Sequence, residues 1–202
     1  MLSRENRLDL YAALCSLFCY PEEELLEHLV TGQLADVLYI LPDLPPPPEF
    51  DESLDLVELQ TAYTGLFINR LGGVPAPPYG SAYLDDNRLV GTSTQFVEQI
   101  YAEAGLAVEG SVEPADFLPT ELEFMFRLIE LEQSANERGD SEAESMFSNL
   151  QARFVDKCLH PWIGEFSNRI QQTSQSHPLY SWSSQLLTTF CELEHAQLKT
   201  SA

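Results

Sequence analysis

The sequence predicts an all-α protein, a single helical-bundle-like domain of about eight to ten helices. Nearly every segment between turn signals places its apolar residues three and four positions apart, which is helical spacing rather than the alternation of a strand. The 202 residues are 44% hydrophobic and 10% aromatic, enough to build one core. We find no internal repeat, βαβ alternation or glycine-rich phosphate loop.

The first helix is predicted from Ser3 to Tyr20, with a row of apolar residues on one side. Pro21 restarts the chain, and the glutamates at 22–24 suit the positive end of a second helix dipole. A short helix over 33–41 follows and ends at Pro42.

Four consecutive prolines, 45–48, then require extended polyproline backbone. We interpret this stretch, 42–50, as a connection between elements of one domain that covers 1–202. Residues 1–44 could form an N-terminal subdomain beside a main body over 51–199.

The next helix is expected to be capped by Ser53 and leads into a loop rich in glycine and proline over 72–80. A further helix begins at 92–94 and ends at Gly105. A long helix runs from Asp116 to Arg138, where Gly139 ends it and Asp140 caps its successor. Pro161 and Pro178 are expected to open the last two helices.

The chain is strongly acidic, with 32 acidic against 10 basic residues and a net charge of -22. This charge argues against nucleic-acid binding and against anionic membrane surfaces. It favours cationic partners, although solubility alone is an equally good reason for it. No apolar run is long enough for membrane insertion and no secretory signal is apparent, so we expect a cytoplasmic protein.

The residues that usually carry catalysis form no recognisable arrangement, so we predict no enzyme, no metal and no cofactor. There is no G-x-S-x-G motif, and the four histidines have no spacing that suggests shared ligation. The four cysteines lack paired C-x2-C spacing and are expected to be buried reduced thiols. Glu121 and Glu123 project in different directions, and solvated helix faces account for most carboxylates.

Two irregular segments remain distinctive. The first, 63–84, ends in a loop that carries several rings, and loops are usually polar. The second, 113–117, leads into the long helix. There Asp116 either caps that helix by accepting a backbone N–H or receives an arginine from a ligand. We expect the two segments to lie together as the wall and the charged border of a peptide groove.

Four motifs in these regions resemble the TorD/DmsD family of redox-enzyme maturation chaperones: YTGLF at 63–67, VPAPPYGSAYLD at 74–85, EPADF at 113–117 leading into LEFM at 122–125, and HPWIGEF at 160–166. The resemblance spans about 8–193 and is most specific in PAPPYGSAYLD. It implies a cytoplasmic all-helical chaperone. Such a protein binds the twin-arginine signal peptide and the apo form of a molybdenum-cofactor oxidoreductase, and assists cofactor insertion before export.

The resemblance also implies which residues bind the peptide: Tyr63, Leu66, Phe67, Tyr79, Gly80, Ser81, Tyr83 and Asp116. We add Phe117, which stands where the family has histidine, and Glu123 on the following helix. The alternative is a helical homodimeric adaptor with no signal-peptide role. The connection at 45–48 and the loop over 70–92 are long enough for two chains to exchange helices, so a homodimer stays open.

Overall fold

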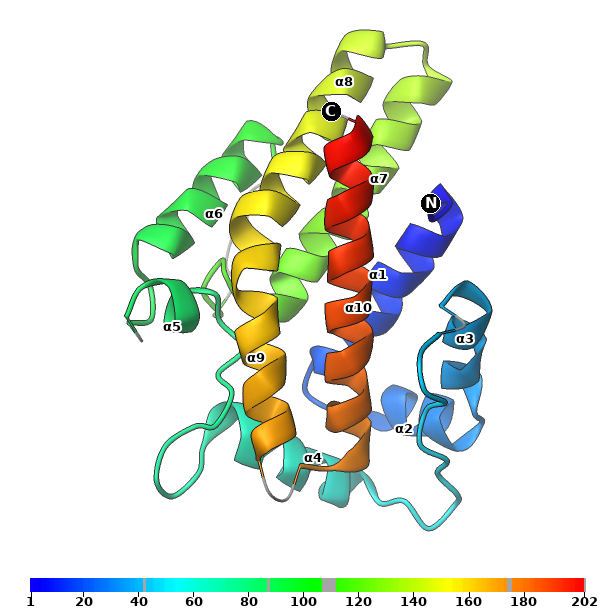
Figure 1. Ribbon diagram of the computed structural model, residues 1–202, viewed down its shortest axis with the longest axis vertical. Coiled ribbons are helices and arrows are strands. Elements are labelled where there is room, and N and C mark those ends of the chain that lie inside the picture. Colours follow the sequence, from blue (N-terminus) through cyan, green and yellow to red (C-terminus); the bar gives the residue numbers. More distant parts are fainter. Residues whose placement is uncertain (42, 87, 107–111, 174–175, 202) are drawn as a thin grey trace.

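The computed structural model describes residues 1–41, 43–86, 88–106, 112–173 and 176–201, and it confirms the all-α prediction (Figure 1). Within these ranges the chain forms helices and a single isolated β-bridge, with no strand. The helices are α1 Arg4–Phe18, α2 Glu23–Val30, α3 Val37–Ile40, α4 Leu56–Tyr63, α5 Ser81–Leu84, α6 Thr92–Glu103, α7 Leu118–Glu137, α8 Ser141–Phe154, α9 His160–Gln172 and α10 Pro178–Ser201, with a 3₁₀ turn η1 at Gln33–Asp36.

The long helices α1, α7, α8, α9 and α10 form the body of the molecule; α4 and α2 lie toward its lower end, and α3 stands at its right-hand side (Figure 1). The largest interhelical contacts are those of α7 with α8, α1 with α7, and α9 with α10. The short helix α5 packs against α9, and α6 packs against α5 and α8.

Helices α8 and α9 follow one another without a loop. A π-helical turn, η3 Val155–Leu159, joins them, and Pro161 lies in the first turn of α9. Proline therefore opens α9 as expected, and the wider π turn joins α8 to α9 without a loop between them.

Helix ends mostly follow the predicted caps. Asp140 Oδ1 accepts the Ala143 N–H at 3.1 Å, and Gly105 and Gly139 have φ of 71° and 70° where their helices end. The prediction for Ser53 is wrong: Asp55 caps α4 by accepting the Val57 N–H at 3.0 Å. Ser53 instead donates its N–H to the Asp51 carboxylate at 2.8 Å, in the turn before the helix.

A buried polar network ties α1 to the end of the chain. Arg7, 6% exposed, donates from Nε and Nη2 to Glu194 of α10, which is 1% exposed, at 2.6–3.0 Å. Gln151 of α8 accepts a further Nη2 hydrogen bond at 2.7 Å. Tyr11 donates its hydroxyl to Glu194 at 3.1 Å. Because every charge here is paired, the network orients three helices without leaving an isolated buried ion.

Candidate functional site

The two irregular segments lie together, as predicted. The Gly80 N–H donates to the Asp116 carbonyl at 3.0 Å, and the Leu118 N–H donates to the Pro78 carbonyl at 2.9 Å. Between these two bonds Tyr79 and Phe117 form the antiparallel β-bridge. The loop before α5 and the loop before α7 are therefore joined through their backbones, although the bonded residues are 36 and 40 positions apart in sequence.

Asp116 holds the two loops in register through its side chain as well. Its Oδ2 accepts the backbone N–H of Ser81, the first residue of α5, at 2.7 Å. The expectation that Asp116 caps its own helix is wrong, because α7 begins after Phe117 without any side-chain cap. The carboxylate is only 1% exposed, and its Oδ1, which has no hydrogen-bond partner within the described ranges, is enclosed. An arginine from a ligand cannot reach it in this conformation.

Polar side chains are buried behind the joined loops. Glu121, in the first turn of α7, is completely buried, and neither of its carboxyl oxygens has a direct hydrogen bond in the described part of the chain. Burial raises its pKa well above the ordinary value, and the nearby Asp116 raises it further, against a smaller lowering by the Trp162 indole N–H. Burial therefore favours the neutral, protonated form of Glu121 in the folded protein. Trp162 also lies against Gly80, where an added Cβ would stand 3.2 Å from Nε1.

The side of the joined loops that reaches solvent carries two rings and a carboxylate. The rings of Tyr79 and Phe117 are 5.4 Å apart with planes inclined by 33°. The Tyr79 hydroxyl donates to Glu113 Oε2 at 2.7 Å. Both rings are partly exposed and Glu113 is exposed. We call Tyr79, Glu113 and Phe117 the loop-pair surface. Burial and the Glu113 carboxylate both raise the pKa of Tyr79, so its hydroxyl stays protonated and remains a donor.

Tyr63, Leu66 and Phe67 lie in the core beneath this surface, each only 3% exposed. The Tyr63 hydroxyl donates to the Phe18 carbonyl at 3.0 Å. Leu66 and Phe67 belong to a π-helical segment, η2 Thr64–Ile68, and the Leu66 carbonyl accepts the Ala76 N–H at 3.1 Å at the start of the loop. These residues position the loop from below and do not face solvent.

Tyr83 and Glu123 lie away from the loop-pair surface, in two different places. The Tyr83 ring stacks on Trp162 at 5.3 Å, and the Arg169 guanidinium lies 4.5 Å from the centre of that ring, which is cation–π distance. Glu123 is exposed on α7, and its charge acts on Cys15 and Cys19 at the end of α1. Of the ten predicted residues, only Tyr79 and Phe117 meet at the loop-pair surface; Gly80, Ser81 and Asp116 lie directly behind them.

Sequence reasoning missed Glu113, Glu121 and the true environment of two cysteines. Cys158 and Cys191 are buried as predicted, but Cys15 and Cys19 are partly exposed. It also missed a histidine pair: the rings of His160 and His195 stack at 3.7 Å. In the described ranges no three His, Cys, Asp or Glu side chains converge as metal ligands.

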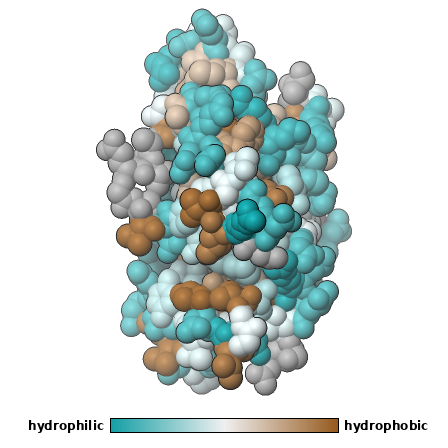
Figure 2. Space-filling model, turned by 90° about the vertical axis from the view of Figure 1, so that its left-hand side faces the viewer, coloured by the Kyte–Doolittle hydropathy of each residue, from teal (hydrophilic) through white to brown (hydrophobic). Residues whose placement is uncertain are grey.

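The face that carries α5 and α6 is mixed in polarity. Figure 2 shows its apolar side chains in separate groups among hydrophilic ones rather than in one continuous patch. Four exposed apolar residues follow α5 or lie at its end and on α6: Leu84, Leu89, Val90 and Phe96.

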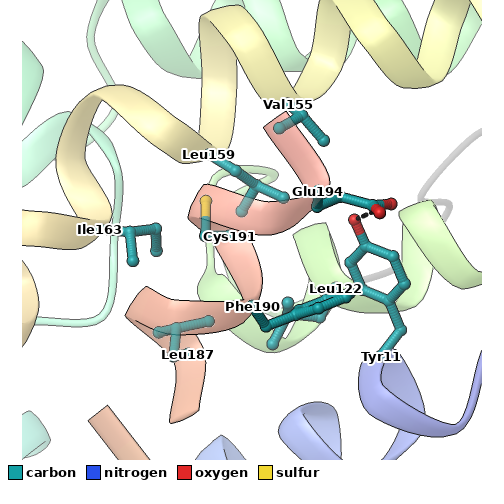
Figure 3. Close-up of a pocket in the computed structure, with 9 residues that line it drawn as sticks. All are labelled: Tyr11, Leu122, Val155, Leu159, Ile163, Leu187, Phe190, Cys191 and Glu194. Atoms are coloured by element: carbon teal, nitrogen blue, oxygen red, sulfur yellow. Dashed lines mark hydrogen bonds between the residues drawn. The ribbon is translucent and has the colours of Figure 1, made fainter. Parts of the chain in front are cut away.

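An internal cavity lined by α1, α7, η3, α9 and α10 is too small for a ligand. Its volume is about 10 Å³, room for about one water molecule, and its walls are almost entirely apolar (Figure 3). Glu194 and Tyr11 at its edge are hydrogen-bonded to each other. We regard it as a packing gap of the core.

Known proteins similar to this chain agree with the sequence resemblance. The family described as nitrate reductase delta subunit matches residues 22–168. The chaperone protein TorD of Photobacterium profundum is 31% identical over 144 residues, which cover 70% of this chain and 64% of that protein. The matched region thus spans under two thirds of that relative. TorD of Vibrio atlanticus is 27% identical over 205 residues, covering 94% and 93% of the two chains.

The fold has a counterpart among solved structures. A crystal structure of a protein from Archaeoglobus fulgidus, described as a candidate redox enzyme maturation protein, superimposes with a TM-score of 0.53 at 22% identity and covers 96% of this chain and 93% of that one. The chaperone names of the relatives agree with the prediction that the chain is not an enzyme. The chain belongs to the nitrate reductase delta subunit family and is related to the chaperone proteins TorD.

Proposed function

We propose that this protein is a cytoplasmic chaperone that binds the twin-arginine signal peptide of a molybdenum-cofactor oxidoreductase, in its apo form, and assists cofactor insertion before export. The observation that carries the proposal is the loop-pair surface, where two partly exposed rings stand beside a carboxylate on backbone fixed by Asp116. The family supports the maturation role. No helix among the described residues is long and apolar enough to cross a membrane.

The chemistry of such a peptide suits the loop-pair surface. Its apolar middle segment would cover the rings of Tyr79 and Phe117, at about 25 cal/mol for each Å² buried, less the cost of ordering the peptide. An arginine would meet Glu113 as a bidentate ion pair, worth about 1–3 kcal/mol if partly desolvated and about 0.5 kcal/mol if exposed. The net charge of -22 draws the basic end of the peptide toward the protein.

The other predicted residues have supporting roles in this proposal. Asp116, Gly80 and Ser81 hold the two loops together, while Tyr63, Leu66 and Phe67 form the floor beneath them.

Isothermal titration calorimetry with synthetic signal peptides of several molybdenum-cofactor oxidoreductases tests the proposal. We expect binding by at least one peptide, and loss of that binding when its two arginines are replaced by glutamine. Tyr79→Ala and Glu113→Gln should each weaken binding about five- to tenfold, equivalent to about 1–1.4 kcal/mol. Glu142→Gln, an exposed glutamate at the start of α8, is the matched control and should not change the affinity.

If none of these peptides binds the folded protein, the proposal is wrong. Light scattering on wild type and Tyr79→Ala separates it from a homodimeric adaptor. We expect the same molar mass for both. A dimer that dissociates on Tyr79→Ala while peptide affinity stays constant would favour the adaptor.

A further inference from the structure

Two thiols stand together where α1 ends, close to the start of α7. Cys15 lies in the last turn of α1 and Cys19 is the residue that ends it, with the Cys19 N–H donating to the Cys15 carbonyl at 3.0 Å. This bond places the two side chains one above the other on the same helix face. Both are partly exposed, whereas Cys158 and Cys191 are 3% and 7% exposed.

From this geometry we infer that Cys19 and Cys15 form an oxidation site for peroxides, in which Cys19 is the reacting thiol and Cys15 resolves it into an intramolecular disulfide. The inference goes beyond the chaperone role and does not depend on it.

The different environments of the two sulfurs assign the roles. The Cys15 thiol donates to the Pro119 carbonyl of α7 at 3.5 Å. A thiol has one proton, so when Cys19 ionises Cys15 can turn that proton toward the Cys19 sulfur. This hydrogen bond lowers the pKa of Cys19, against the raising effects of burial, Glu123 and Glu22. The same interaction and burial raise the pKa of Cys15. Because the Cys15 thiol is held by the Pro119 carbonyl, whereas Cys19 stands at the end of the helix, we assign Cys19 as the thiol that reacts, in its thiolate form.

The reaction balances with a peroxide as the only oxidant. The Cys19 thiolate attacks one oxygen of hydrogen peroxide, the O–O bond breaks, and hydroxide leaves and takes up a proton to become water. The Cys15 sulfur then attacks the sulfenic sulfur of Cys19, the S–O bond breaks, and a second water leaves with the Cys15 proton. Two thiols have lost two electrons in total, and one peroxide has become two waters.

The position of Cys19 at the end of α1 allows the Cys15–Cys19 disulfide to form. Side chains four residues apart on a helix have Cβ atoms about 5–6 Å apart, and a disulfide needs about 3.5–4.5 Å. The Cβ atoms of Cys15 and Cys19 must therefore approach each other by about 1–2 Å. Cys19 already has extended backbone (φ -73°, ψ 161°), so it can move without unwinding a complete turn. Closure would also take the Cys15 sulfur away from the Pro119 carbonyl, at the first turn of α7.

Thiol mapping on the full-length protein tests this inference, with the two buried cysteines as internal controls. Under native conditions we expect iodoacetamide to modify Cys19 first, about tenfold faster than Cys15 and faster still than Cys158 or Cys191. Burial raises the pKa of Cys191 to about 12, so it should remain unmodified until the protein unfolds. Equal rates for all four cysteines in the folded protein would contradict the inference.

Peroxide treatment then tests the disulfide. Chymotrypsin cleaves after Phe18, between the two cysteines, so oxidised wild type should yield two peptides joined by a Cys15–Cys19 bond and lighter by two hydrogen atoms. In Cys15→Ala a dimedone-type reagent should trap sulfenic acid at Cys19, and in Cys19→Ser almost none should form at Cys15. Circular dichroism checks that both variants keep their helices. If folded wild type gives over-oxidised or intermolecular products and no Cys15–Cys19 disulfide, the inference is wrong.

Discussion

The carboxylate of Asp116 accepts the backbone N–H of Ser81 at 2.7 Å and so fastens the loop before α7 to the first residue of α5. The carboxylate is buried and is made part of the fold rather than left for a ligand. Substitutions here should therefore change the stability of the protein before they change any direct contact with a peptide.

Asp116→Ala should lower the free energy of unfolding by about 1–3 kcal/mol, because it leaves the buried Ser81 N–H without an acceptor. Asp116→Asn keeps an oxygen at the same place and should retain most of that stability. Urea unfolding followed by circular dichroism measures both. If both variants lose the same free energy of unfolding, the hydrogen bond to Ser81 does not explain how Asp116 stabilises the protein.

Glu121→Gln should change how stability depends on pH. Because the folded pKa of Glu121 is raised, its contribution is fully present below the unfolded value of 4.5 and is lost as pH rises from there to the folded pKa. The loss is about 1.4 kcal/mol per pH unit over that range. Glutamine does not ionise, so the variant should gain stability relative to wild type as pH rises.

Urea midpoints between about pH 5 and pH 8 measure the effect of Glu121→Gln, since this range lies above the unfolded pKa of glutamate. Glu123→Gln is the matched control, because Glu123 is exposed two residues further along the same helix. Parallel pH curves for wild type and Glu121→Gln would show that Glu121 is not held neutral in the fold.

Gly80→Ala should destabilise the protein by about 1–3 kcal/mol through overpacking. The backbone of Gly80 is ordinary right-handed helix, so the reason for glycine is the Trp162 indole, 3.2 Å from an added Cβ. Trp162 is fully buried, so moving its ring would displace other core side chains. Gly65→Ala, where an added Cβ meets nothing within 4 Å, should be neutral or slightly stabilising in the same thermal unfolding experiment.

Glu194→Gln should cost about 3–5 kcal/mol, because it leaves the buried Arg7 charge without its partner. The double variant Arg7→Met with Glu194→Leu should recover most of this loss. Arg127→Gln, which removes an exposed pair with Glu130, should cost less than about 1 kcal/mol. Chemical unfolding of the four proteins gives the comparison. A double variant as unstable as Glu194→Gln would argue that lost packing, and not an uncompensated charge, causes the effect.

The fold and the meeting of the two loops were predictable, because helical periodicity, turn residues and the resemblance agreed. The roles of individual polar residues were not. Glu121, Leu122 and Met125 follow Leu118 by three, four and seven positions, so Glu121 lies on the buried face of α7, a pattern that the sequence already contains. The sequence alone favours a solvated carboxylate even on such a face, because burying one alone is costly. Asp116 and Trp162 come close to Glu121 only in the folded chain.

The role of Asp116 is not visible in the sequence for a related reason. A carboxylate at the start of a helix is normally assigned to that helix, and its real partner, Ser81, is a distant residue that only the folded chain brings near. Similarly, aromatic residues such as Tyr63 and Phe67 are typical both of binding surfaces and of cores. In the structure their rings pack against Phe18, Phe166 and Tyr180, which places them in the core.

The pairing of Arg7 with Glu194 has a consequence for the synthesis of the protein. The two residues are 187 positions apart, so while the chain is being made the first helix carries a cation whose buried partner does not yet exist. Until the last helix leaves the ribosome, Arg7 is better solvated than buried, and α1 cannot settle into its final place. The bundle therefore closes only after α10 has been synthesised.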